Sequence, residues 1–493
     1  MIQKFDPLTS KDFDKGLVTR SDVLKLDMNQ SPDCLDIKWN FDGSIQKRLG
    51  SSTMNSTALQ GTGGWASFDF GATSRRWLVV AAGTGIHASS NLGVDFFVVQ
   101  TSRTQTYQYF ERSKNVCIAT SDAYDVPLFW NGTGTTRFET LAPGSAPSCK
   151  YSVNFQGFLI LLNSLARPRG FFYADDDLQL VSAWPDSFDL PSSYDDEITG
   201  SFILNKRLYV STRYYLYRVL YTGGNPDWEY LKVKDFGFVP RTARIVTLKG
   251  GEVAVGEDWS RRLRAFDGSD DVILSDNIEN DNSMAEFSTS RISYAGSGLV
   301  INHSVYDPIE QEYRLCVAIG SASSETTHAI LINARTLAMY PYSNQRFQSM
   351  CVAESANRQY LIGVDRSGRV HVINSGNLDI NLAVDEHYDS PFIYRRDPAE
   401  VSKASHIDFY LTPTSSGTMN YQDRSDFSSV YQPISATTGL VTTNSVNLIK
   451  WSVDVPSTQN IYQFRLISSA NTANPWKLVR IGYFLEGMGI GGN

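Results

Sequence analysis

Clustered carboxylates are the first residues in this sequence whose spacing could support chemistry, because grouped acids can bind a metal ion. The three acidic runs are Asp175–Asp177, Asp195–Glu197 and Asp270–Asp271. A calcium loop needs oxygen ligands at alternating positions and a glycine at its turn, and none of the runs has this pattern. We interpret them as solvated turn acids. In an assembly with a channel, Asp175, Asp176 and Asp177 are candidates to line the lumen and keep nucleic acid from adhering.

The histidines and cysteines form no stronger constellation. The six histidines are isolated, without an HExxH or HxH pair, and no GxSxG elbow is present. The five cysteines, none of them in a CxxC pair, are Cys34, Cys117, Cys149, Cys316 and Cys351. This odd, scattered set predicts reduced and mostly buried thiols, which indicates folding in a reducing cytoplasm. We expect no catalytic residue, no metal site and no cofactor, and therefore no enzyme.

Two further enzyme classes also lack their signatures. The glycine-rich stretches Gly61–Gly64 and Gly487–Gly492 resemble phosphate loops, but the first lacks the required lysine and serine or threonine, and neither opens a helix. The recurrent sialidase turn S-x-D-x-G-x-T-W is absent, and nothing singles out the carboxylate pair that a glycosidase needs. We interpret the glycines as a turn and a tail.

The elements that must carry these residues are strands. The chain has 493 residues, of which 12% are aromatic and 19% charged, and its net charge is −8. This composition excludes disorder, collagen and coiled coil, and an acidic chain is not typical of a dedicated nucleic-acid binder. Apolar residues at helical spacing are nearly absent. One short candidate is Asp397–His406, where Pro398 would occupy the first turn.

Short strand pairs recur along the chain at a regular interval. One apolar residue marks each of seven pairs: Val79, Ile118, Leu159, Leu208, Val253, Cys316 and Leu361. The steps between these markers are 39, 41, 49, 45, 63 and 45 residues. Because a four-stranded propeller blade takes about 40–50 residues, the spacing predicts an all-β fold with a β-propeller of about six to seven blades. A large double β-sandwich would also give regular short strands, and no WD or kelch signature is present.

The rhythm of the strands divides the chain into three regions. We expect an N-terminal strap or hairpin segment over 1–60, the propeller over 61–380 with an insertion near 277–297, and a C-terminal β domain over 381–493. Alternating runs in the last region predict a small antiparallel sandwich, or an extra sheet docked on the ring. Apolar runs are too short to cross a bilayer and no signal peptide is visible, so we expect no membrane segment.

The most informative stretch is Gly16–Gly50. It places six residues in the order Pro … hydrophobic-Asp … Gly-x-hydrophobic-x-Lys-Arg-x-Gly: Pro32, Asp36, Gly43, Lys47, Arg48 and Gly50. Asp42 and Gly43 form a hairpin turn signal, which would join Leu35–Trp39 to Ser44–Lys47. The sequence therefore predicts a fixed strap with a structural or assembly role for the six residues.

This pattern resembles the opening of tail nozzle and head-completion proteins of short-tailed phages, the tail tubular protein B type. Two weaker echoes are Val305–Arg314, similar to a turn in the blades of these proteins, and Trp476–Glu486, similar to their final strand pair. The resemblance implies a virion structural protein that forms a hexameric ring below the portal or adaptor. Such a ring retains and conducts genomic DNA without binding a specific sequence.

The resemblance also implies partners and a location. The partners would be further copies of the chain, the portal or adaptor, and tail needle or fibre proteins, and the location would be the virion tail after assembly in the host cytoplasm. Two alternatives come from other classes of protein. One is a glycan-binding or glycan-cleaving propeller for host attachment, and the other is a cellular propeller scaffold for protein contacts.

Overall fold

Strands carry nearly all of the regular structure in this protein. The computed structural model describes the chain except for residues 1–5, 12, 20–24, 41, 60–63, 73–74, 134–136, 143–144, 176–183, 185, 194, 225–226, 279–291, 294–301, 320–324, 377, 381, 385, 394–401, 414–416, 426–431, 434–439, 443–448, 455–457, 460–461, 469–475 and 488–493. Among the described residues, no helix is long and apolar enough to cross a membrane.

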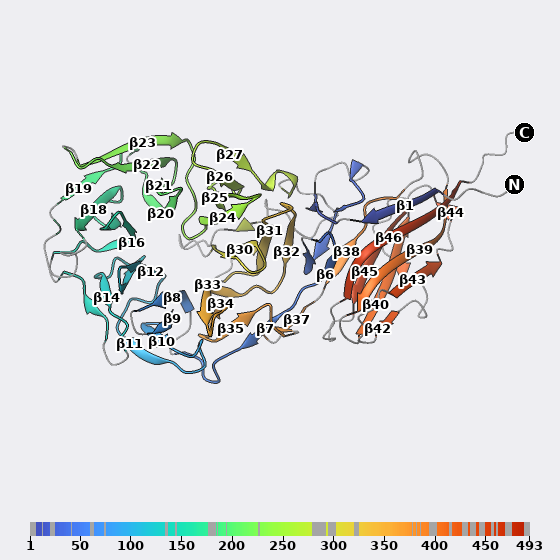
Figure 1. Ribbon diagram of the computed structural model, residues 1–493, viewed down its shortest axis with the longest axis horizontal. Helices are drawn as coiled ribbons and strands as arrows, with labels where there is room; N and C mark the ends of the chain where they lie inside the picture. The colour runs from blue at the N-terminus through green and yellow to red at the C-terminus, as the bar shows by residue number, and fades with distance from the viewer. Residues whose placement is uncertain are drawn as a thin grey trace, which may run out of the picture.

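Seven blades of four antiparallel strands stand around a central channel and form a β-propeller (Figure 1). Blades 1 and 2 contain β8 (Gly64–Gly71), β9 (Arg76–Ala82), β10 (Gly85–Ser89) and β11 (Phe97–Gln100), then β12 (Gln108–Ser113), β13 (Val116–Ser121), β14 (Leu128–Trp130) and β15 (Glu139–Thr140). Blades 3 and 4 contain β16 (Cys149–Phe155), β17 (Phe158–Ser164), β18 (Gly170–Asp175) and β19 (Asp186–Asp189), then β20 (Ile198–Leu204), β21 (Arg207–Thr212), β22 (Leu216–Tyr221) and β23 (Trp228–Lys234).

Blades 5 to 7 complete the ring. They contain β24 (Arg244–Leu248), β25 (Gly251–Glu257), β26 (Leu263–Phe266) and β27 (Asp271–Ile273), then β29 (His303–Asp307), β30 (Glu312–Ile319), β31 (His328–Asn333) and β32 (Met339–Tyr342), and finally β33 (Phe347–Ser355), β34 (Arg358–Asp365) and β35 (Val370–Ile373). All seven sequence markers lie in the second strand of a blade. The predicted β-propeller is therefore confirmed, with seven blades.

The second strand of a blade is buried on both faces, and this burial explains why the sequence reveals it. In β17, the residues from Leu159 to Leu162 are all completely buried. A strand covered on both faces reads as a continuous apolar run. The outer strand β23 differs, since Glu229–Lys232 are exposed. Outer strands therefore carry a weaker apolar signal.

The ring is closed by a strand from the other end of the chain. Blade 7 takes its fourth strand, β7 (Ser51–Thr53), from the segment that precedes blade 1, and β7 pairs antiparallel with β35. Ser52 lies opposite Val372, and the Met54 N–H donates to the Val370 carbonyl at 2.7 Å. Because a closed ring leaves no gap between first and last blades, this pairing joins the two ends of the propeller.

Proline at position 52 is expected to weaken the pairing of β7 with β35. Antiparallel pairs alternate between hydrogen-bonded and non-hydrogen-bonded, so Ser52 and Val372 form the hydrogen-bonded pair next to Met54 and Val370. Ser52→Pro removes the N–H donor and the hydrogen bonds of the Ser52 hydroxyl with Ser375, and it should lower the free energy of unfolding by about 2–4 kcal/mol. Thr53→Pro is the matched control, because its N–H faces away from β35 and it loses only a 3.3 Å side-chain contact with His371. If both variants lose the same free energy of unfolding in urea, the backbone pairing of β7 with β35 does not stabilise the ring as expected.

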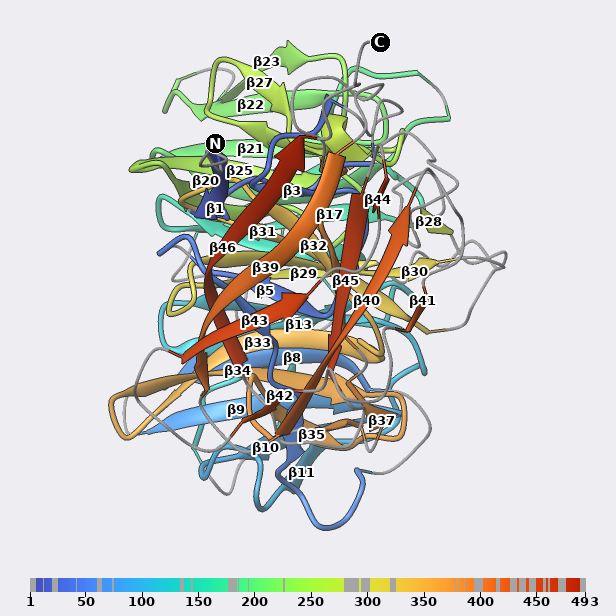
Figure 2. The same cartoon turned by 90° about the vertical axis from the view of Figure 1, so that its right-hand side faces the viewer.

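A β-sandwich packs against blades 6 and 7 (Figure 2). One sheet contains β39 (Ser402–Pro413), β43 (Ile449–Asp454), β44 (Thr458–Gln459) and β46 (Trp476–Gly487), together with β1 (Asp6–Lys11), β5 (Ile37–Trp39) and β6 (Ile45–Lys47). The other sheet contains β38 (His387–Asp389), β40 (Gly417–Ser425), β41 (Gln432–Pro433), β42 (Leu440–Thr442) and β45 (Tyr462–Ser468), together with β4 (Cys34–Leu35). Between the sheets, the Phe409 ring packs edge-on against Phe464 at 5.3 Å.

The N-terminal segment, predicted as a strap or hairpin over 1–60, does not form one separate unit. Its strands are shared among three places: β1, β4, β5 and β6 in the sandwich, β7 in blade 7, and β2 (Gly16–Leu17) and β3 (Gln30–Ser31) beside β32 of blade 6. The boundary at residue 60 therefore does not separate the strap from the propeller. Short strands rich in polar residues cannot bury a face alone, so they complete sheets that other segments begin.

Two further expectations can be compared with the structure. The helix expected over Asp397–His406 is wrong for its described part, because Ser402–His406 belong to β39, where the run Ile407–Leu411 pairs with β43 and β46. Most of the insertion expected near 277–297 lies outside the described residues; the described parts are the end of η2 (Ser275–Ile278) and β28 (Ile292–Ser293). All five cysteines are free and four are buried, as predicted.

Candidate functional site

The three stretches that carry the phage resemblance meet in one place, between blade 6 and the sandwich. Strand β6 of the first stretch pairs with β46 of the third, with Leu478 opposite Ile45. Lys477 of β46 also forms an ion pair with Asp42 in the hairpin turn. Lys38 of β5 forms an ion pair with Glu310 in the turn between β29 and β30, which belongs to the second stretch. Residues hundreds of positions apart thus form one structural unit.

The predicted hairpin within this unit is confirmed. Strands β5 and β6 pair antiparallel, with Trp39 opposite Ile45. Gly43 has a φ of +76°, and its N–H donates to the Asn40 carbonyl at 3.2 Å. Only glycine adopts this left-handed backbone without strain, so the turn explains why position 43 is a glycine.

Asp36 belongs to a group of buried ion pairs that we call the junction, in which Arg48 pairs with Asp36 and Asp379 and the adjacent Lys47 pairs with Glu386. Its side chain is completely buried and its backbone has a φ of +57°. The Ser343 N–H donates to Asp36 Oδ1 at 2.8 Å, and the Asp36 N–H donates to the Pro341 carbonyl at 3.1 Å. Asp36 therefore attaches the N-terminal segment to the end of blade 6.

Arg48 carries one of the two positive charges of the junction, and the other belongs to Lys47. Its Nε lies 2.5 Å from Asp36 Oδ1, a second ion pair reaches Asp379, and Nη2 donates to the Ser343 carbonyl at 2.9 Å. The guanidinium also lies over the Tyr342 ring at 4.8 Å. Burial acts to lower the pKa of Arg48, but the two carboxylates outweigh it and raise the pKa. A planar group with five donors suits several partners at once.

Glycine and proline positions of the motif allow the chain to pass close to the junction. The Gly50 N–H donates to the Gly376 carbonyl at 3.0 Å, and a Cβ on Gly50 would lie 2.3 Å from the Leu378 carbonyl oxygen. Any larger residue at position 50 would therefore collide with backbone. Pro32 is buried beside β3. The structure thus gathers Asp36, Arg48 and Gly50 around the end of blade 6 and the loop after β35.

Lys47 and Glu386 form the third ion pair of the junction. Lys47 Nζ lies 2.8 Å from Glu386 Oε2, and both side chains are at most 5% exposed. Burial raises the pKa of the Glu386 carboxyl to about 7, although the Lys47 charge opposes the shift. Glu386 precedes β38, so this pair joins β6 of one sandwich sheet to a strand of the other.

Stability is expected to depend on the ionisation of Glu386. Its folded pKa of about 7 lies above the ordinary value of 4.5, so the folded state binds a proton more tightly than the unfolded state. The resulting stabilisation is complete below pH ~4.5 and is lost as pH rises toward ~7. Glu386→Gln should therefore flatten the pH dependence of the unfolding free energy between these values, measured in urea. The exposed Glu139 provides the control Glu139→Gln; identical curves for the wild type and Glu386→Gln would contradict the expectation.

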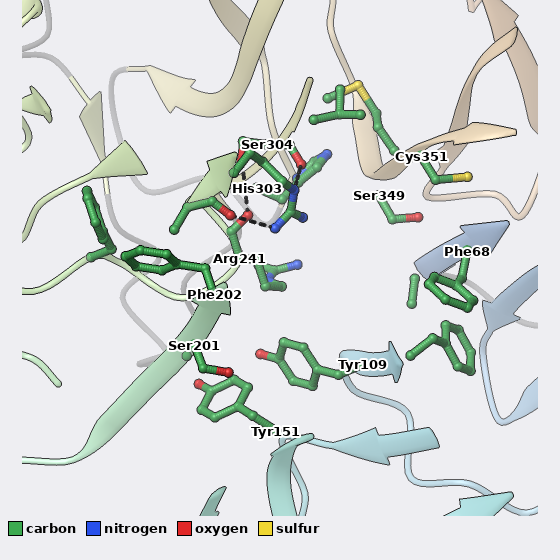
Figure 3. Close-up of a pocket in the computed structure, with 18 of the residues that line it drawn as sticks. Phe68, Tyr109, Tyr151, Ser201, Phe202, Arg241, His303, Ser304, Ser349 and Cys351 are labelled. Atoms are coloured by element: carbon green, nitrogen blue, oxygen red, sulfur yellow. Dashed lines mark hydrogen bonds between the residues drawn. The ribbon is translucent and has the colours of Figure 1, made fainter. Parts of the chain in front are cut away.

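The central channel is the second candidate site. A cavity of about 550 Å³ lies inside the ring, and its walls come from the first strand of every blade. Figure 3 shows Tyr109, Tyr151, Phe202 and Arg241 around this space. The Tyr109 hydroxyl donates to Asp122 Oδ1 at 2.9 Å, and burial raises the pKa of that carboxyl. Tyrosine, serine and arginine groups therefore give the channel a mixed aromatic and polar lining.

Of the three acids proposed for the lumen, only the backbone of Asp175 belongs to the described part of the chain. Asp176 and Asp177 fall outside the described residues, and Asp175 ends β18 opposite Phe158. Among the described residues, no group of three or more histidine, cysteine, aspartate and glutamate side chains is placed to hold a metal ion.

Sequence reasoning identified the motif side of the junction but missed its partners. Asp379, Glu386 and Ser343 lie about 300 positions from Asp36 or Arg48 along the chain. They stand in polar segments without a recognisable motif, so no local signal identifies them. Arg241 and Arg244 of the channel were missed for the same reason.

No family model matches this chain, and a search of curated protein sequences finds no similar protein. Among solved structures, the Cps50 (Swd1) β-propeller domain of Myceliophteria thermophila is 8% identical, with a TM-score of 0.41 over 65% of this chain and 99% of that one. The Pan2 WD40 domain of Neurospora crassa is 6% identical, with a TM-score of 0.41 over 65% and 94%. Apo AztD from Citrobacter koseri is 9% identical, with a TM-score of 0.39 over 70% and 93%. None of the three is named as a phage protein, so the resemblance of the motif stays a prediction.

Proposed function

We propose that this protein is a structural subunit of a phage tail, which assembles into a ring below the portal or adaptor and retains genomic DNA until infection. The observation that carries the proposal is the junction. The motif that resembles phage tail proteins builds the buried ionic network between the propeller and the sandwich. In the proposed ring, each subunit resists the force of the retained DNA. A propeller and a sandwich that cannot move against each other would help it to do so.

The packing around the junction supports this rigidity. Buried apolar residues of blades 5 to 7 and of both sandwich sheets belong to one contiguous cluster, which includes Tyr313, Leu331, Trp39 and Phe464. Protein interiors are close-packed and transmit strain rather than absorb it. The propeller and the sandwich therefore behave as one body in the proposed ring.

In the proposed assembly, the DNA path lies outside the individual propeller, because the channel of one propeller is small. A cavity of about 550 Å³ lies in the range of small-molecule sites, roughly 300–1,000 Å³. A duplex whose major groove alone is about 12 Å wide needs a far larger opening. In the proposed assembly, DNA runs along the ring axis, between subunits, and meets their outer surfaces.

The proposal is tested by the mass and shape of the purified protein. Light scattering coupled to size-exclusion chromatography should give about six times the subunit mass of 55.0 kDa, and electron microscopy should show rings with a central hole. The proposed assembly uses the portal or adaptor as a template, so the measurement is repeated in the presence of a portal complex from the same genome. A monomer in both measurements would overturn the proposal.

Glycan binding for host attachment is the second candidate function, and one surface favours it. On the outer edge of blades 3 and 4, Tyr230 and Tyr221 are 45% and 40% exposed. The Tyr230 ring stacks on Phe188 at 6.0 Å, and Tyr221 packs against Phe158 at 4.7 Å. Exposed aromatic rings in a rigid array suit the apolar faces of sugars.

A binding experiment separates the two functions. Under the glycan hypothesis, Tyr230→Ala should abolish retention of the protein on host surface polysaccharide, whereas Tyr214→Ala, which removes an exposed tyrosine at another position, should not. Absence of retention for the wild type would reject this second function. Under the first proposal, ring formation is measured independently of any polysaccharide.

A further inference from the structure

The central channel contains two arginines from one short segment. Arg241 precedes β24 and Arg244 begins it, and both line the cavity together with Ala243. The Arg241 guanidinium lies over the Tyr107 ring at 3.4 Å, and the charge of Asp122 acts on it. Arg241 therefore has both an aromatic and an acidic neighbour.

Arg244 has a different environment. Its Nε donates to the Ser304 carbonyl at 3.0 Å, and its Nη1 donates to the Ala243 carbonyl at 2.9 Å. Within the described part of the chain, no carboxylate forms an ion pair with Arg244. Burial lowers the pKa of its guanidinium, and the charge of Arg241 acts in the same direction, whereas Tyr313 opposes them. An arginine keeps its charge in proteins, so the channel carries a cation without a counter-ion among the described residues.

The cavity also holds polar groups that can donate to an anion. Ser349 lines it from blade 7 and Ser152 from blade 3, and both hydroxyl oxygens are buried without a hydrogen-bond partner among the described residues. Ser349 is only 7% exposed. A buried hydroxyl without a partner costs free energy, and a bound oxyanion or a water molecule would satisfy it.

The volume and the walls of the cavity limit the size of such an anion. About 550 Å³ accommodates a small molecule with its hydration shell but not a polymer. The aromatic walls, including Phe68 and Phe110 at 6.1 Å from each other, reduce the local dielectric response. Charge-assisted hydrogen bonds from arginine to carboxylate or phosphate oxygens are strong in this setting.

We propose that the central channel binds a small oxyanion, carried by a phosphate or a carboxylate group, with Arg244 as its principal cation and Arg241 as the second. The bound anion neutralises Arg244 and fixes the position of β24 against β29. The site lies inside one propeller, so it is independent of ring assembly and of the proposed tail function.

Thermal unfolding of the purified full-length chain tests this site. Potassium phosphate at about 10 mM should raise the Tm by roughly 2 °C or more relative to potassium chloride of equal ionic strength. Arg244→Met should lose this rise, whereas Arg207→Met, which removes an exposed arginine at the start of β21, should keep it. Acetate and citrate, in separate measurements, distinguish a carboxylate from a phosphate ligand. An equal rise in Arg244→Met, or no rise in the wild type with any of the three anions, would overturn the proposal.

A measurement on the unsubstituted chain keeps the test valid if Arg244→Met fails to fold. Crystals grown with selenate, a phosphate-like oxyanion with a strong anomalous signal, should show an anomalous peak within hydrogen-bond distance of Arg244. A channel without such a peak would count against the site. This experiment uses no variant and no oligomer, so its result does not depend on the outcome of the ring measurement.

Discussion

Replacing Arg48 with methionine is expected to lower the free energy of unfolding by about 3–5 kcal/mol, which makes it one of the two most damaging single changes. Arg48 is 3% exposed and its two partners, Asp36 and Asp379, are fully buried. Methionine keeps most of the side-chain volume but removes the charge. Two buried carboxylates then lose their shared cation, and the hydrogen bonds that remain, from Ser343 and Gln345, compensate only part of the cost of desolvation. Urea unfolding of the wild type and Arg48→Met measures the difference.

Arg76 provides a matched control for this experiment. It also joins two carboxylates, with Nη2 2.7 Å from Asp69 and Nη1 2.6 Å from Glu354, but its side chain is 47% exposed. Since exposed ion pairs contribute about 0–1 kcal/mol, Arg76→Met should change stability by no more than that amount. Comparable losses in the two variants would mean that burial does not determine the strength of the junction.

A double variant identifies the origin of the loss. If the cost of Arg48→Met comes from unpaired carboxylates, then Asp379→Asn should be less damaging in the Arg48→Met background than in the wild type. Residues in one ionic network are coupled by about 0.5–3 kcal/mol. Additive losses would show that Arg48 acts through packing against Tyr342 instead.

Replacing Trp39 with alanine is the second large effect, with an expected loss of about 3–5 kcal/mol. Trp39 is completely buried between Phe13 and Tyr388, with ring centroids 6.3 and 6.1 Å away. Its backbone carbonyl also accepts a hydrogen bond from Asn333 of blade 6 at 3.0 Å. Alanine would leave a cavity where the hairpin, the sandwich and the propeller meet. The measurement is again the free energy of unfolding in urea.

Trp39→Phe is the control for this prediction. A phenylalanine refills much of the space and retains the aromatic contacts, so the loss should stay below about 2 kcal/mol. Both variants should keep the strand content of the wild type in circular dichroism. If alanine and phenylalanine are equally tolerated at position 39, then the region is not tightly packed and the proposed rigid connection fails.

The blades could be predicted from the sequence because the pattern that marks each of them lies within a few consecutive residues. Each blade contains a second strand that is buried on both faces, such as the run around Leu159 or Val79, and a turn that leads to the third strand. Apolar runs of this kind are encoded within six or seven consecutive residues. Their recurrence predicted the fold class and about six to seven blades, and the structure has seven.

Strands at the channel and at the rim were harder to recognise. Inner strands line a cavity and alternate tyrosine, serine and arginine with apolar residues, and outer strands such as β23 are exposed. Their positions depend on the sheet that they complete rather than on their own composition. The helix expected over Asp397–His406 is wrong for its described part, Ser402–His406, for the same cause, since the partner strands of β39 begin more than 40 residues later.

The sequence by itself determined the all-β class, the seven repeats, the hairpin at Gly43 and the motif residues, because each depends on neighbours within a few positions. Only the tertiary structure decided that β7 closes the ring, that Asp36 and Arg48 meet Asp379, and that two arginines share the channel. These contacts join segments 60 to more than 300 residues apart. They exist because the closed ring and the sandwich bring those segments together, and no local pattern encodes that proximity.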